Sequence, residues 1–160
     1  MATSNSEETH KQTQAILSSL LVLVRETQRS YARATEVAQS SYLKYLFQKY
    51  ELQCSQLVLE LESILADTSL ENTKSMKERK ATNLVSLFEP VSDQTLVQEL
   101  LELNNHSKKY LQALNQLPLP ETYKPLVEIQ STHLNQAISS LKKVANKSEK
   151  QTLKTSRAHT

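Results

Sequence analysis

The chain has 160 residues, 38% of them hydrophobic, a formal net charge of +2 and no glycine. An average chain of this length holds about eleven glycines, and tight hairpin turns depend on the positive φ angles that glycine adopts most easily. The composition therefore disfavours a fold with many β-hairpins, and it excludes the glycine-containing phosphate loop, dinucleotide fingerprint and nucleophile elbow.

The first half of the chain predicts two amphipathic helices. Residues 1–11 are polar and predict a flexible segment. Apolar residues then recur every three or four positions, which predicts helices over residues 12–38 and 41–66. The short link between the two ranges predicts an antiparallel hairpin. The residues expected to face the core are Ile16, Leu20, Leu23, Thr27, Tyr31, Ala34, Ala38, Leu43, Leu46, Phe47, Tyr50, Cys54, Leu57, Leu61 and Ile64.

The second half predicts two more long helices after a polar, charge-rich stretch. That stretch predicts one short helix over residues 73–88, which Pro90 ends. Asp93 is the expected N-cap of a helix that continues to about residue 117. A further helix is expected from residues 121–122 to 146, followed by a basic flexible tail over residues 147–160. The expected core residues of these two long helices are Leu96, Leu100, Leu103, Tyr110, Leu114, Leu117, Leu126, Ile129, Leu134, Ala137, Ile138, Leu141 and Val144.

The lengths of the links predict the architecture. Both outer pairs of helices have short links, whereas the two pairs are joined through the long stretch before Asp93. We therefore expect an all-α four-helix bundle over residues 12–146, with one long crossover between the helices at 41–66 and 93–117. One long crossover is the connectivity of ferritin-like folds.

Cysteine, hydropathy and charge limit the compartment and the partners. Cys54 is the only cysteine, which excludes an intrachain disulfide or a cysteine-based zinc cluster and predicts a small buried hydrophobe. The longest apolar stretch, Ala15–Val24, is too short to span a bilayer. We expect a cytoplasmic protein without a membrane span. Basic residues gather in Lys142–Arg157, but no aromatic residues are interleaved with them, so no nucleic-acid partner is expected.

One segment resembles a known family. Leu46–Leu61 reads LFQKYELQCSQLVLEL and carries Leu-Phe, then Gln56 nine residues on, then Glu-Leu four residues later. This pattern resembles a helix of a bacterial ferritin-like family, a domain of unknown function. Weaker similarities, which extend the resemblance to about residues 14–145, lie at Tyr31–Glu36, Asn104–Leu114, Leu119–Glu121 and Ile129–His133. The resemblance implies a ferritin-like fold and no established reaction.

The usual metal ligands of ferritin-like proteins are missing from the sequence. Those proteins use a Glu from each of two helices and a Glu-x-x-His from each of the other two. The only Glu-x-x-His here joins Glu7 to His10, in the segment predicted to be flexible. The positions three residues before His133 and His106 hold Gln and Leu. The standard di-iron ligand set is therefore absent.

Five polar residues remain on or next to the expected inward stripes: Gln28, Gln53, Glu60, Gln130 and His133. One carboxylate, one imidazole and several amides suit a pair of hard cations poorly. Two interpretations stay open: a weak mononuclear metal site at Glu60 and His133, supported by the three glutamines, or a buried hydrogen-bond network that fixes helix register.

The sequence supports two functions from different classes. The first is a non-catalytic structural or protein-interaction module, without a cofactor, that binds a protein partner or itself. Tyr42 and Tyr45, near the first link, are a candidate contact patch. The second is a stress-linked metal-binding oxidase or storage protein that holds iron or manganese at Glu60 and His133. No Ser/His/acid motif is present, and no catalytic residue is assigned.

Overall fold

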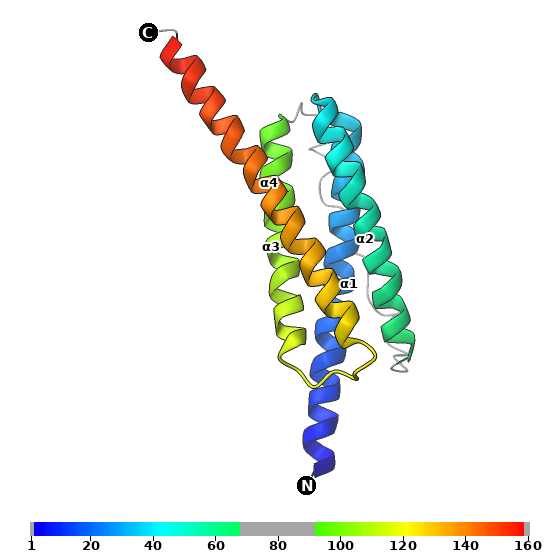
Figure 1. The fold of residues 1–160 in the computed structure, drawn as a ribbon. Helices are drawn as coiled ribbons and strands as arrows, with labels where there is room; N and C mark the ends of the chain where they lie inside the picture. Colours follow the sequence, from blue (N-terminus) through cyan, green and yellow to red (C-terminus); the bar gives the residue numbers. More distant parts are fainter. Residues whose placement is uncertain (1, 68–91, 159–160) are drawn as a thin grey trace.

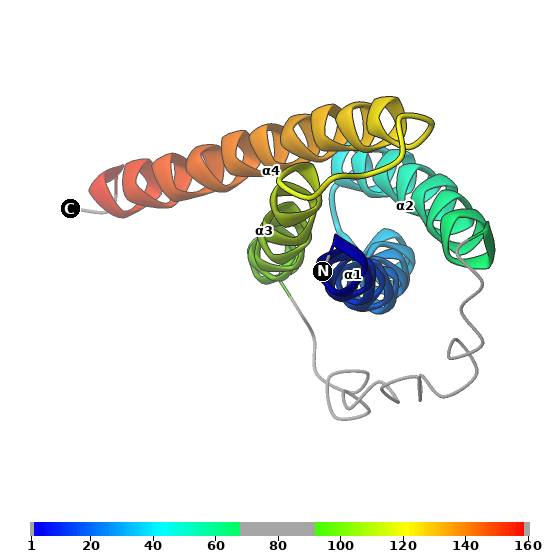
Figure 2. The same cartoon turned by 90° about the horizontal axis from the view of Figure 1, so that it is seen from below.

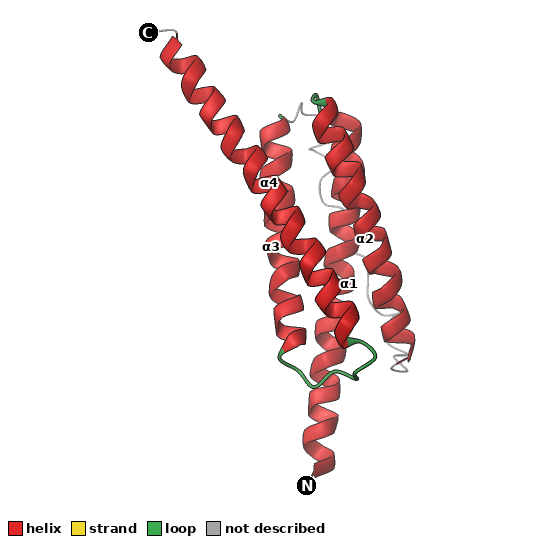
Figure 3. Cartoon of the chain, viewed as in Figure 1, coloured by secondary structure: helices red, strands yellow, loops and turns green. Residues whose placement is uncertain are grey.

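The computed structural model describes residues 2–67 and 92–158. These residues form helices and no strands (Figure 3), which confirms the predicted all-α class. The helices pack together as a bundle (Figure 1), and they are α1 (Ala2–Val37), α2 (Ser41–Asp67), α3 (Asp93–Asn115) and α4 (Lys124–Ala158). None of the described helices combines the length and the hydropathy that a membrane crossing requires.

Polar contacts fix the directions of the helices. Asp93, at the start of α3, accepts hydrogen bonds from the backbone N–H groups of Gln39 and Ser40 at 2.8 and 3.1 Å. The start of α3 therefore lies beside the turn between α1 and α2, and α3 runs in the same direction as α2. α4 then runs in the opposite direction to α3 and packs mainly against it (Figure 1). The link from α2 to α3, and with it the short helix predicted over residues 73–88, lies outside the described residues.

Several helix boundaries differ from the predicted ones. Ser92, not Asp93, is the N-cap of α3, because its side chain accepts from the backbone N–H of Thr95, and Asp93 occupies the first turn. α1 already begins at Ala2 and α4 continues to Ala158, so both terminal ranges that were predicted to be flexible are largely helical. Both ends project beyond the bundle (Figure 1). Neither range contains proline or glycine, so nothing in its composition breaks the helix.

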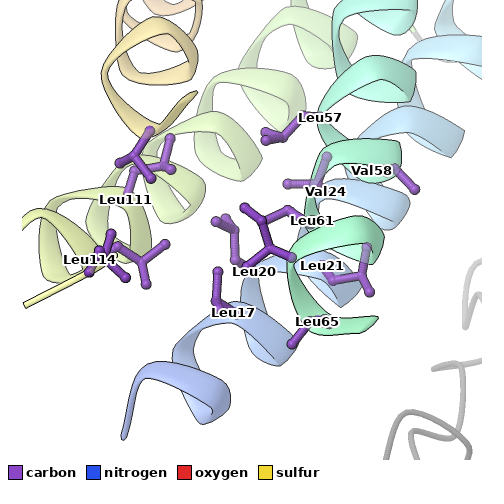
Figure 4. Close-up of a cluster of buried hydrophobic side chains, with 13 residues drawn as sticks. Leu17, Leu20, Leu21, Val24, Leu57, Val58, Leu61, Leu65, Leu111 and Leu114 are labelled. Atoms are coloured by element: carbon purple, nitrogen blue, oxygen red, sulfur yellow. The ribbon is translucent and has the colours of Figure 1, made fainter. Parts of the chain in front are cut away.

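The core consists of two apolar clusters, one toward each end of the bundle. The first cluster is rich in leucine from α1, α2 and α3 (Figure 4), and its buried members are Leu17, Leu20, Leu21, Val24, Leu57, Val58, Leu61, Ile64, Leu65, Leu111, Leu114, Leu119 and Val127. The second combines aromatic rings with small residues, and its buried members are Tyr31, Ala34, Ala38, Leu43, Leu46, Phe47, Tyr50, Leu96, Val97, Leu100, Ala137, Leu141 and Ala145. The Tyr31 ring lies 6.2 Å from that of Phe47 and 6.0 Å from that of Tyr50, between centroids.

The predicted core faces agree with the structure on α2 and depart from it elsewhere. Every predicted core residue of α2 is buried except Cys54, which is partly buried. On α1 the face is rotated, so that Leu17 and Leu21 are buried while Ile16 and Leu23 are only partly so. The prediction for Ile129 of α4 is wrong, since this side chain is 51% exposed. Viewed from below, α1 lies between α2 and α3, and α4 crosses obliquely along one side of the bundle (Figure 2).

Candidate functional site

A polar layer separates the two apolar clusters. Four polar residues of the described chain are buried, namely Thr27, Asn104, Ser107 and Gln130. Along each helix they fall between the last residue of one cluster and the first of the other. The amide of Asn104 donates to the Tyr31 hydroxyl at 2.8 Å and to the Leu100 carbonyl oxygen at 2.7 Å. The hydroxyl of Thr27 donates to the Leu23 carbonyl oxygen at 2.8 Å. The middle of the bundle therefore holds polar side chains, Asn104 and Thr27 among them hydrogen-bonded, rather than continuous apolar packing.

A small cavity lies in this layer. Its volume is about 30 Å³, which is enough to hold a water molecule. All four helices contribute to its lining, which consists of Tyr31, Tyr50, Gln53, Cys54, Leu57, Asn104, Gln130, His133, Leu134 and Ala137. Three of the five polar residues that the sequence singled out are among them: Gln53, Gln130 and His133.

The other two singled-out residues lie apart from this lining. Glu60 faces the neighbouring part of the core, where its Oε2 accepts from Gln130 Nε2 at 2.8 Å. Glu60 is therefore linked to the cavity through Gln130. Gln28 donates instead to the hydroxyl of Ser55 at 2.7 Å, where α1 meets α2. The structure thus connects Gln53, Glu60, Gln130 and His133 but not Gln28.

Burial keeps two ionisable groups of the cavity, the Cys54 thiol and the Tyr31 hydroxyl, uncharged. Burial, with a smaller contribution from the charge of Glu51, raises the pKa of the Cys54 thiol to about 12. Burial likewise raises the pKa of the Tyr31 hydroxyl far above its ordinary value. Cys54 is therefore a thiol at neutral pH, and a thiol is a poor nucleophile and a poor metal ligand compared with a thiolate. Within the described part of the chain, one buried side-chain polar atom has no hydrogen-bond partner, the Nδ1 of His133.

This donor set does not fit a di-iron or di-manganese centre. Among the described residues, no group of three or more His, Cys, Asp or Glu side chains is placed to hold a metal ion. The cavity itself offers one imidazole, one protonated thiol, three amides and two tyrosine hydroxyls, whereas hard cations require several charged oxygens.

The outward face of α2 carries a second candidate site. Tyr45, Leu52 and Leu59 are 67%, 68% and 67% exposed, and we call these three residues the outer stripe. Seven residues are almost two full helical turns, so the three side chains form a row along one face. Tyr42, also in α2, is 62% exposed. Sequence reasoning named Tyr42 and Tyr45 as a contact patch but missed Leu52 and Leu59, although their seven-residue spacing was a readable signal.

Comparison of the chain with protein-family models, with curated proteins and with solved structures finds no match.

Proposed function

We propose that this chain is a non-catalytic, ferritin-like bundle that acts as a structural or protein-interaction module, with the outer stripe as its binding surface. The single observation that carries the proposal is the row of Tyr45, Leu52 and Leu59, each about two-thirds exposed. Single exposed apolar residues are ordinary on a protein surface, whereas aligned ones are typical of interaction sites. Tyrosine in particular contributes much of the affinity at protein interfaces.

The ferritin-like part of the proposal is supported by the directions of the helices. α2 and α3 run in the same direction, so the end of α2 and the start of α3 lie at opposite ends of the bundle. One long crossover between two such helices is characteristic of ferritin-like bundles. The resemblance of Leu46–Leu61 to the bacterial ferritin-like family points the same way. We place the protein in the cytoplasm, in agreement with its lone cysteine.

The polar layer supports an architectural role for the interior. Three hydrogen bonds in or next to this layer join one helix to another: Asn104 of α3 to Tyr31 of α1, Gln130 of α4 to Glu60 of α2, and Tyr50 of α2 to Ser140 of α4 at 2.8 Å. A buried polar pair is satisfied in only one register of its helices, so such pairs select one packing arrangement. In the proposed function these groups align the bundle and leave binding to the surface.

Site-specific photocrosslinking tests the proposed binding surface. A photoreactive amino acid is placed at Leu52, and the chain is irradiated in the cells that make it. The matched control carries the same group at Gln112, an exposed position of α3. We expect protein adducts from position 52 well above those from position 112. Equal adduct yields from the two positions would contradict the proposal.

A second candidate function, metal binding, is favoured by the unpartnered Nδ1 of His133. A ligand that binds only the folded state stabilises it by about 2.7 kcal/mol at a hundredfold excess over Kd. For a chain of this size that stabilisation raises Tm by several degrees. We expect no saturable rise in Tm with iron, manganese or zinc. A saturable rise that both Glu60→Gln and His133→Ala abolish would make metal binding the leading function.

A further inference from the structure

The outer stripe is symmetric about its central residue. Tyr45 and Leu59 each lie seven residues from Leu52, one on either side. A two-fold axis that passes at Leu52, perpendicular to the helix, sets each Leu52 against the partner's Leu52. The same axis sets Tyr45 against the partner's Leu59 and Leu59 against the partner's Tyr45. A surface that matches itself in this way is what a two-fold symmetric dimer requires.

From this symmetry we infer that the outer stripe binds a second copy of the chain, with the two α2 helices antiparallel. The inference rests on the proposed function, since it names the partner of the same surface. α2 has 27 residues and is therefore about 40 Å long, so two copies can align over the whole stripe. Lys49 and Gln56 alternate with the apolar residues along this face. Because they interrupt the apolar row, we expect a dimer with a Kd in the micromolar range rather than a permanent one.

Charges beside the stripe select the antiparallel orientation. At about 100° per residue, Lys44 lies about 80° to one side of Leu52, and Lys49 lies about 60° to the other side. Glu62 follows Lys44 by 18 residues, which is about five full turns, so it shares the flank of Lys44. In an antiparallel pair equal flanks meet, and Lys44 comes within about one turn of the partner's Glu62. In a parallel pair opposite flanks meet, and Lys44 then shares its flank with the partner's Lys49, a like charge about one and a half turns away along the axis.

Glu62 is able to serve such a contact. It accepts a hydrogen bond from Arg25 through Oε1 at 2.6 Å, and its side chain is 43% exposed. Lys44 is exposed as well. In the antiparallel pair Lys44 adds a cation to an existing ion pair, an arrangement that steers the orientation more than it adds affinity.

Disulfide crosslinking tests the orientation. Tyr45→Cys and Leu59→Cys are made separately in a Cys54→Ser chain, with tags of different mass. Under mild oxidation we expect a mixture of the two to form mixed dimers at least about tenfold faster than either chain dimerises alone, since a tenfold ratio is only about 1.4 kcal/mol. Gln112→Cys on α3 is the control for random collision. Faster crosslinking within each single variant than between the two would overturn the antiparallel pairing.

Sedimentation equilibrium of the purified chain tests whether a second copy of the chain binds the outer stripe. We expect a monomer–dimer equilibrium at tens of micromolar for the wild type. Leu52→Glu sets two carboxylates against each other at the axis, so dimerisation should weaken at least about tenfold. Circular dichroism of this variant should match the wild type, because Leu52 is 68% exposed. A wild type that stays monomeric overturns self-pairing. If photocrosslinking at position 52 then still captures another protein, the proposed function stands without this inference; if it captures none, both fail.

Discussion

The two faces of α2 are both apolar, yet they end in opposite environments. The inner face buries Phe47 and Tyr50 to 0% and 3% exposure, whereas the outer stripe leaves Leu52 and Leu59 two-thirds exposed. The two faces differ in how closely their apolar residues follow one another along the helix. The inner face receives an apolar residue every three or four positions, and the outer stripe only every seven.

This difference shows how one helix serves two purposes. A dense stripe offers a continuous apolar surface, and its burial supplies about 25 cal/mol for each Å² removed from water. The outer stripe is interrupted by Lys49 and Gln56, so its exposure to water is tolerated. Its apolar side chains still contribute to the binding free energy when a partner covers them. Apolar spacing thus separates a face that stabilises the fold from a face that is available for binding.

The largest expected effect contrasts one leucine from each face. Leu57→Ala should lower the free energy of unfolding by about 2–5 kcal/mol, because it removes a buried side chain that packs in the leucine-rich cluster. Leu52→Ala, the same change on the outer stripe, should cost less than about 0.5 kcal/mol when measured on dilute, monomeric protein. Chemical denaturation of the two variants gives both numbers. Equal losses would mean that the two faces do not differ as described.

Cys54, at the edge of the inner face, gives a pH-dependent test. The folded chain holds the thiol proton to a pKa of about 12, whereas the ordinary value is 9.0. Between these values the unfolded chain binds fewer protons, so the free energy of unfolding falls as the pH rises, by up to about 1.4 kcal/mol per pH unit from this group. Below pH 9 the stability that comes from the protonated Cys54 thiol is fully present.

The control for that test is Cys54→Ala, which lacks the titrating group. Denaturation curves of the two chains should therefore diverge only above about pH 9, with the wild type losing stability faster. Parallel curves up to pH 11 would show that Cys54 titrates normally and lies in contact with water.

A smaller effect contrasts two tyrosines of α2. Tyr50→Phe removes the hydroxyl that donates to Ser140, so it should cost about 0.5–1.5 kcal/mol of unfolding free energy. Tyr45→Phe, on the outer stripe, should change stability by no more than about 0.5 kcal/mol. Denaturation of both variants checks the contrast. A loss of unfolding free energy in Tyr45→Phe as large as that in Tyr50→Phe would contradict it.

The sequence predicted the four long helices and the inner face of α2, because dense periodicity defines both. It misplaced features that depend on how the helices are tilted. Ile129 falls on the apolar stripe of α4, but α4 crosses the bundle obliquely and packs mainly on α3, so this position faces solvent. The rotation of the buried face on α1 has a similar cause, since α1 packs on both α2 and α3.

The candidate site was predicted in part. Residue type and position brought together Gln53, Gln130 and His133, because all three lie beside inward stripes at the same level of the bundle. Gln28 lies apart from them, beside Ser55, because a helical stripe does not reveal which neighbour a residue at its edge will contact. Asn104 was overlooked because asparagine seldom signals burial in a sequence; only its partner, the Tyr31 hydroxyl, explains why it is buried.

On this account, the inner face of α2 stabilises the fold and the outer stripe binds a second copy of the chain. Both roles are tested most directly by Tm as a function of protein concentration. Association of folded chains makes Tm rise with concentration. We predict that Tm of the wild type rises over the micromolar range, that Leu57→Ala melts lower at every concentration but rises in parallel, and that Leu52→Glu matches the dilute wild type and stays constant. A Leu52→Glu chain whose Tm rises as steeply as that of the wild type would contradict the account.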